Sequence, residues 1–127
     1  VGFLAAGERD ELDEALRRGE VVALHVDGDR FRRGIPAIVA GRRVEFPTGP
    51  ARLAARHRAA LVYGYCSRRA DGTQVGRVVR EIPIAEDGRE AIHAATLELA
   101  RLFEATVRER PDEWTMFRDF FAEKEAA

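Results

Sequence analysis

The sequence has a single cysteine, almost no net charge and no long apolar run, and each scarcity argues against a class of protein. With Cys66 alone the chain cannot form an internal disulfide, and one thiol is compatible with a reducing compartment. The 21 basic and 22 acidic residues leave a formal net charge of -1, which argues against a nucleic-acid partner. No apolar run approaches the roughly 20 residues that span a bilayer. No signal peptide is recognisable either.

The pattern of apolar residues predicts one α/β domain, for which 127 residues suffice. We expect a mixed, mainly parallel sheet flanked by helices. The predicted helices cover Glu8–Arg18, a segment that begins at Pro50, residues 90–109, and a short tail that holds Phe117, Phe120 and Phe121. The predicted strands cover Val21–Val26, Gly41–Phe46, Leu61–Cys66 and Val75–Ile84, with an Asp71-Gly72 turn between the last two.

An acidic turn follows the first predicted strand. Val21–Val26 is a continuous apolar run, as expected of a strand buried on both faces, and Asp27-Gly28-Asp29 comes directly after it. In open α/β sheets, binding sites lie beyond the carboxyl ends of the strands, which makes Asp27 and Asp29 candidate site residues. The alternative is that Asp-Gly-Asp only forms a tight turn.

Arginines follow the acidic turn without an intervening acid. They are Arg30, Arg32, Arg33, Arg42 and Arg43. A guanidinium presents a planar fork of donors that suits phosphate, whether on a lipid headgroup or on an acyl carrier. The alternative is a solvated loop edge. Farther on, Phe46-Pro47-Thr48-Gly49-Pro50 places proline at the first position of a helix, where backbone N–H groups at Thr48 and Gly49 can hold an anion. As an alternative, Gly-Pro is simply a good helix start.

The remaining residues that could carry chemistry have ordinary explanations. We expect His25 to be a satisfied core histidine, His57 and His93 to be helical with His93 exposed, and Tyr63, Tyr65 and Cys66 to belong to the core of a strand. Trp114 and the phenylalanines that follow it can form an aromatic patch at a membrane interface or fold back onto the core, and we favour the second. We find no metal-ligand cluster and expect no metal.

Several segments together carry a family resemblance. They are VVALHVDGDRFRRG, the Gly41-Arg42-Arg43 segment, FPTGPARLA from Phe46, and Arg110-Pro111-Asp112-Glu113-Trp114. They resemble the bacterial lysophospholipid acyltransferase superfamily, in the branch of the lipid A and phosphatidylinositol mannoside acyltransferases. The resemblance covers nearly the whole chain but only the C-terminal half of the family's domain. The aromatic pair that the family carries before Gly41 is absent.

The family's most diagnostic motif, a histidine and an acidic residue with four residues between them, is missing from its place. Only His93 and Glu98 have that spacing, and they lie far downstream of the FPTGPA segment instead of before it. The chain also begins with Val1 and not with Met, which indicates a fragment. We therefore expect residues 1–127 to be a single partial domain whose catalytic histidine lies upstream of residue 1.

The resemblance implies an enzyme that moves a fatty acyl group from acyl-CoA or acyl carrier protein to a hydroxyl group, with no other cofactor. Asp29, with Asp27, would support the missing histidine, and Arg30, Arg32, Arg33, Thr48 and Gly49 would bind substrate. The wider superfamily has a glutamate where this chain has Thr48 and a Thr-Arg pair where it has Pro50-Ala51. That departure favours a glycolipid or lipid A-like acceptor over glycerol phosphate.

The resemblance also implies partners and a location. We expect a phospholipid or glycolipid acceptor, the membrane surface and the N-terminal half of the same domain as partners, on the cytoplasmic face of the bacterial plasma membrane. Without that half the chain would be inactive, would expose strand edges and apolar surface around Val21–Val26, and would self-associate. The alternative is a non-catalytic remnant that binds anionic lipid or a partner. A histidine motif upstream of Val1 would separate the two.

Overall fold

The structure is a computed structural model that describes residues 9–27, 34–84, 88–116 and 120–121. In chain order the elements are α1 (Arg9–Arg17), β1 (Gly34–Val39), β2 (Arg42–Pro47), α2 (Gly49–His57), β3 (Leu61–Arg68), β4 (Gln74–Ile82), α3 (Arg89–Glu109) and a 3-10 turn η1 (Pro111–Glu113). The predicted α/β class is confirmed. The three predicted main helices and the strands at β2, β3 and β4 are also confirmed, within a few residues at each end.

The prediction of a mainly parallel sheet is wrong for the described residues. Their strands form two separate antiparallel pairs, β1 with β2 and β3 with β4. The connections explain this, because a short loop joins antiparallel neighbours whereas parallel neighbours need a long crossover. Ala40 and Gly41 link β1 to β2 with φ angles of 51° and 76°, the left-handed pair that a tight hairpin turn requires.

The first predicted strand is also absent. Val21–Val26 is extended but has no strand assignment, and the side chain of Val21 is 97% exposed. His25 is likewise exposed, so its predicted place in the core is wrong. A strand exists only where a partner accepts its backbone hydrogen bonds, and among the described residues neither hairpin pairs with residues 21–26. Conversely, β1 was not predicted, because Pro36 interrupts its apolar run; as the edge of a two-stranded sheet it tolerates that proline.

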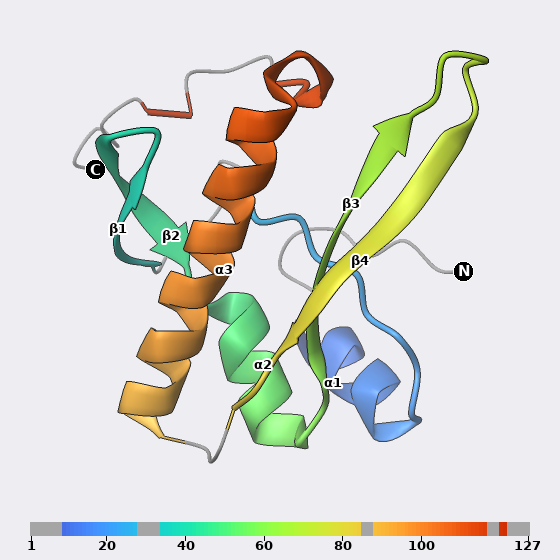
Figure 1. Cartoon of the computed structure of the whole chain (residues 1–127). Coiled ribbons are helices and arrows are strands. Elements are labelled where there is room, and N and C mark those ends of the chain that lie inside the picture. The colour runs from blue at the N-terminus through green and yellow to red at the C-terminus, as the bar shows by residue number, and fades with distance from the viewer. Residues whose placement is uncertain (1–8, 28–33, 85–87, 117–119, 122–127) are drawn as a thin grey trace.

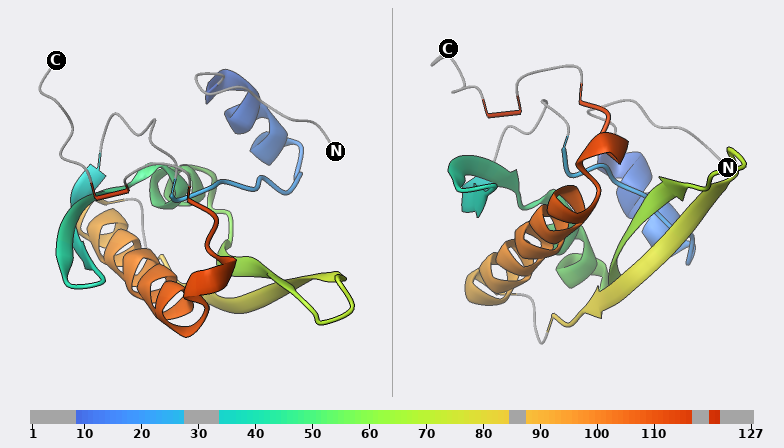
Figure 2. Two further views of the ribbon diagram at one scale, coloured as in Figure 1. Left: turned by 90° about the horizontal axis from the view of Figure 1, so that it is seen from above. Right: turned by 45° about the horizontal axis from the view of Figure 1, so that its top comes forward.

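Helix α3 lies between the two hairpins and forms the centre of the core (Figures 1 and 2). Its buried residues recur at helical spacing: Ala95, Thr96, Leu99, Ala100, Leu102 and Phe103. They meet Val39 and Phe46 from the first hairpin, both fully buried, and Leu61 and Tyr63 from the second. One helix thus holds together two hairpins that do not hydrogen-bond to each other.

The second hairpin extends away from the rest of the molecule at its loop end (Figure 1). Along β3 the residues alternate, so that Leu61, Tyr63 and Ser67 are buried while Val62, Gly64 and Cys66 are exposed. The prediction that Cys66 belongs to the core is therefore wrong, because it falls on the outward face. The predictions for Tyr63, which is buried, and for the exposed His93 are confirmed.

The aromatic residues after α3 fold back onto the core, as predicted. The Trp114 ring lies 5.5 Å from Phe103 and 5.2 Å from Phe120, in both cases edge-on. The predicted helical tail is not seen in the described residues, since only the three-residue turn η1 follows α3 and Trp114–Met116 is irregular. Phe117 lies outside the described residues.

Candidate functional site

The helix start at Thr48-Gly49 lies at the end of the first hairpin. Phe46 and Pro47 are fully buried and anchor the end of β2, whereas Thr48 is half-buried and Gly49 is exposed. The Thr48 carbonyl accepts a hydrogen bond from Arg52 N at 3.0 Å, and the Thr48 side chain makes no capping hydrogen bond. The first N–H groups of a helix have no partner within the helix. Gly49 therefore presents backbone at an accessible helix N-terminus.

The strand register pairs the residue that follows the arginine segment with the residue that precedes Thr48. Gly34, the first residue of β1, pairs with Pro47, the last residue of β2. Arg33 directly precedes Gly34 in the chain and Thr48 directly follows Pro47. The described residues that flank the two candidate segments, Gly34 and Pro47, therefore lie side by side. Asp29, Arg30, Arg32 and Arg33 themselves lie outside the described residues, so their roles stay predictions.

Asp27 is the last described residue before the arginine segment, and it contacts the tail of the chain. The Trp114 indole N–H donates to Asp27 Oδ2 at 3.0 Å, and both residues are half-buried. Asp27 was a candidate site residue because it was predicted to follow a strand of the sheet. Since no strand precedes it among the described residues, that reason no longer applies. The structure instead shows that the Asp27 carboxylate accepts a hydrogen bond from Trp114, which follows α3 in the chain.

His93 and Glu98, which have the spacing of the family's motif, do not face each other on α3. His93 and Glu98 lie five residues apart on α3, which turns their side chains roughly 140° away from each other. Glu98 instead pairs with Arg80 on β4 at 3.1 Å and with Arg101 at 2.8 Å, and those arginines lower the pKa of its carboxyl. The interval from His93 to Glu98 therefore equals that of the family's motif by chance, without forming the pair of side chains that the motif provides.

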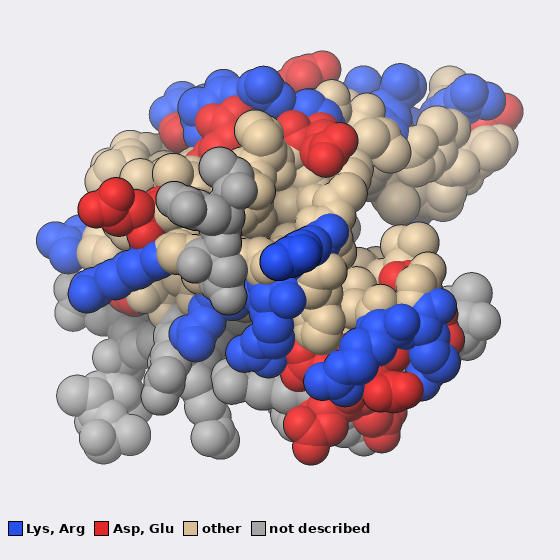
Figure 3. All heavy atoms as spheres, turned by 90° about the horizontal axis from the view of Figure 1, so that it is seen from below, with Lys and Arg blue, Asp and Glu red and all other residues tan. Residues whose placement is uncertain are grey.

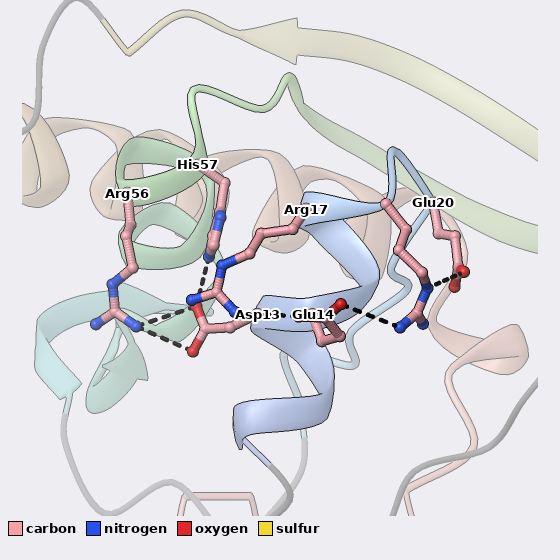
Figure 4. Close-up of polar contacts among 7 residues, drawn as sticks. Asp13, Glu14, Arg17, Glu20, Arg56 and His57 are labelled. Carbon is pink, nitrogen blue, oxygen red and sulfur yellow. Dashed lines mark hydrogen bonds and ion pairs between the residues drawn. The ribbon is translucent and has the colours of Figure 1, made fainter.

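The third histidine has a partner that the sequence did not reveal. His57 Nε2 hydrogen-bonds to Asp13 Oδ1, and Arg56 Nη1 donates to the same carboxylate at 3.1 and 3.2 Å (Figure 4). Asp13 is buried and His57 nearly so. The carboxylate belongs to α1 and both of its partners to α2, so this cluster joins two helices. No local pattern predicts the pair, because 44 residues separate Asp13 from His57.

The hydrogen bond from His57, followed by the contacts from Arg56, lowers the pKa of Asp13 below its ordinary value of 3.8. A depressed folded-state pKa means that the charged carboxylate stabilises the fold above about pH 4, and that this stabilisation is lost as the pH falls through the folded-state pKa. We therefore expect Asp13→Asn to lower the Tm at pH 7 by roughly 5 °C.

The difference between wild type and Asp13→Asn should shrink when thermal unfolding is followed from pH 4 downward. The matched control is Glu14→Gln, which alters an exposed carboxylate on the same helix and should change the Tm little. A difference that stays constant from pH 7 to pH 2.5 would show that ionisation of Asp13 does not contribute.

The surface carries both signs of charge. Acidic side chains lie beside basic ones over much of the face seen from below (Figure 3). On α2 and at its end, Arg52, Arg56 and Arg58 are exposed. Within the described ranges no helix is long and apolar enough to cross a membrane, and no group of three potential metal ligands occurs.

Comparison with known proteins defines the class. Residues 5–122 match the bacterial lipid A biosynthesis acyltransferase family, and the chain belongs to that family. Among curated proteins, it is 32% identical over 120 residues to the phosphatidylinositol mannoside acyltransferase of Mycobacterium tuberculosis H37Rv, covering 91% of this chain and 36% of the relative. The protein of the same name from Mycolicibacterium smegmatis is 30% identical over 118 residues, with 91% of this chain and 38% of the relative covered.

These matches confirm the predicted branch of the superfamily. The chain spans little more than a third of the length of these relatives. The residues that it does span include both candidate segments, the arginine segment and the helix start at Thr48-Gly49.

Proposed function

We propose that this chain is part of a membrane-associated acyltransferase that moves a fatty acyl group from acyl-CoA or acyl carrier protein to a hydroxyl of a glycolipid or lipid A-like acceptor. Membership in the lipid A biosynthesis acyltransferase family supports the reaction class. The relatives are phosphatidylinositol mannoside acyltransferases, which supports a phosphate-bearing glycolipid as acceptor. The enzyme would act at the cytoplasmic face of the plasma membrane, with the acyl thioester as a substrate and no separate cofactor.

One observation carries the placement of the substrate site, namely the pairing of Gly34 with Pro47. This pairing supports the proposal that the arginine segment, which precedes Gly34 in the chain, would end near the N-terminus of α2. Arg30, Arg32 and Arg33 would supply charged donors to a phosphate, and the backbone at Thr48 and Gly49 would supply N–H donors and the positive end of the α2 dipole. Guanidinium groups and a helix N-terminus favour the same kind of ligand, an anion with several oxygen acceptors.

The chemical step would require a general base that these residues do not supply. A histidine from the N-terminal half of the domain, upstream of residue 1, would deprotonate the acceptor hydroxyl, which then attacks the thioester carbonyl. Asp29 would orient that histidine or shape the acceptor pocket. Asp27 would assist by holding the segment in place through Trp114. The 127 residues alone would then be inactive. The alternative function, a remnant that only binds anionic lipid or a partner, would also lack acyl transfer.

We expect Arg32→Ala and Arg33→Ala in the full-length protein to raise the KM for the acceptor roughly 10-fold or more and to leave kcat nearly unchanged. Contacts to a phosphate that does not react stabilise the ground state and the transition state equally. Steady-state kinetics with an acyl thioester and a phosphate-bearing glycolipid would measure this split.

The control for that experiment is Arg69→Ala. Arg69 is exposed at the loop end of the second hairpin, where the ribbon extends away from α2 (Figure 1), and its removal should leave both constants unchanged. If the two loop variants instead lower kcat at constant KM, the arginines act in the transition state. If full-length protein with an upstream His-x4-Asp/Glu motif transfers no acyl group, the binding alternative gains support.

A further inference from the structure

The segment Arg110–Trp114, one of those that carry the family resemblance, begins with a tight turn directly after α3 (Figure 1). Arg110 is the C-cap of the helix, and its N–H donates to Thr106 O at 2.9 Å. Pro111 disfavours the helical conformation at the residue before it, so α3 ends there and the 3-10 turn η1 begins. Glu113 N then donates to Arg110 O at 3.1 Å. This turn therefore fixes the direction in which the chain leaves α3.

An ion pair closes the same turn. Arg110 Nη1 donates to Glu113 Oε1 at 3.0 Å, and the two side chains are 32% and 23% exposed. Two buried atoms of the pair, Arg110 Nε and Glu113 Oε2, have no hydrogen-bond partner among the described residues. A partly buried ion pair with incomplete hydrogen bonds contributes little to folding stability. Its main effect is therefore expected on the geometry of the residue that follows, Trp114.

Trp114 is held from three sides. Its ring lies edge-on to Phe103, at 5.5 Å between centroids, and edge-on to Phe120, at 5.2 Å. On the third side its indole N–H donates to Asp27 Oδ2 at 3.0 Å. An indole has this one donor and no acceptor, so the orientation of the ring decides whether the hydrogen bond forms. A change in the turn that rotates Trp114 would therefore remove the contact to Asp27.

Asp27 links the turn to the arginine segment along the chain. It lies 87 residues before Trp114 and is the last described residue before residue 28. Its neighbour Val26 packs against the core. The hydrogen bond from Trp114 and the packing of Val26 thus fix the position of the chain directly before the arginine segment.

We propose that Arg110 and Glu113 are positioning residues for the acceptor site. Their ion pair holds the turn so that the Trp114 N–H meets Asp27, and Asp27 in turn sets where the arginine segment begins. The proposal rests on the proposed function, since it takes the arginine segment to bind the phosphate of the acceptor. The turn after α3 then acts on acceptor binding without touching the acceptor.

Hydrogen exchange of the Trp114 indole N–H tests the first link. In the full-length protein, NMR identifies its signal as the one that Trp114→Phe removes. Arg110→Ala and Glu113→Ala should speed its exchange with solvent roughly 10-fold or more. Arg110→Lys should stay within about twofold of wild type, because the pair has a single N–H···O contact, which an ammonium group can also make.

The matched control for the exchange experiment is Glu109→Ala. Glu109 is 70% exposed and approaches the same guanidinium only at 3.9 Å, too far for a hydrogen bond. Its removal should leave the exchange of the indole N–H unchanged. Exchange as slow as that of wild type in Arg110→Ala would overturn the proposal, because the pair would then not hold Trp114.

Steady-state kinetics of the full-length protein with an acyl-CoA and phosphatidylinositol mannoside test the second link. Arg110→Ala and Trp114→Phe should each raise the KM for the acceptor roughly 3- to 10-fold, leave kcat nearly unchanged, and not add in the double variant, because the two residues act in series. Arg110→Lys should keep the KM of wild type. A pair that only stabilises the end of α3 would lower the Tm and leave the KM unchanged, which would overturn the proposal.

Binding to lipid separates this proposal from the proposed function. Vesicles of phosphatidylcholine that contain phosphatidylinositol offer the phosphate without requiring acyl transfer, and Arg110→Ala should bind them roughly 3- to 10-fold more weakly than wild type. Faster indole exchange and weaker binding in Arg110→Ala, without transfer by wild type, would contradict the proposed function alone. Transfer by wild type, with indole exchange unchanged in Arg110→Ala, would contradict the positioning role alone.

Discussion

Replacing Phe103 with alanine is expected to destabilise the chain by about 3–5 kcal/mol, a large part of the roughly 5–15 kcal/mol by which a typical domain is stable. Phe103 is 5% exposed and lies on α3, where its ring centroid is 5.8 Å from Phe46, 5.5 Å from Trp114 and 5.7 Å from Phe120. The ring thus joins the first hairpin and the aromatic residues of the tail to one helix. Its removal leaves a cavity where the first hairpin, α3 and the aromatic residues of the tail meet.

Denaturant unfolding followed by the fluorescence of Trp114 would measure this loss, because the indole packs directly on the Phe103 ring. Leu97→Ala is the matched control, since Leu97 lies on the same helix but is 39% exposed, and its truncation should cost less than about 1 kcal/mol. A cost below roughly 1.5 kcal/mol for Phe103→Ala would mean that the aromatic cluster is not part of the cooperative core.

The second large effect is expected at Gly64. A Cβ atom at this position would lie 2.6 Å from the backbone oxygen of Arg77 on the paired strand, a distance that real Cβ contacts do not reach. The strand register shifts between Tyr63 and Gly64, where β4 carries one extra residue, so the two backbones approach closely at this irregularity. Gly64→Ala must displace backbone, and we expect it to cost about 1–3 kcal/mol.

Gly76→Ala provides the control on the same hairpin. Nothing lies within 4 Å of the Cβ that would be added there, so the substitution should be neutral or slightly stabilising through the unfolded state. Thermal unfolding of the two variants side by side would measure the difference. Equal midpoints would show that the β3–β4 pair relaxes freely around the irregularity and that Gly64 has no packing role.

The candidate site illustrates where local patterns suffice and where they fail. The helix start at Thr48-Gly49 was predicted because Gly-Pro fixes backbone geometry within a few residues, and α2 begins there. The Asp13–His57 pair was not predicted, because the packing of α1 on α2 creates it. The role of Asp27 was predicted from a strand that did not form. The structure instead assigns that carboxylate to Trp114, which lies 87 residues away in the chain.

The sequence by itself determined the class of fold, the helices and the hairpin strands of the second half, and the family, because these depend on periodicity, turn residues and motifs within short windows. Only the tertiary structure decided which strands pair, that Val21–Val26 stays unpaired among the described residues, and that the start of β1 lies beside the end of β2 next to α2. The physical reason is that a strand, unlike a helix, satisfies its backbone hydrogen bonds outside its own segment. Its existence and register therefore depend on which other part of the chain lies next to it.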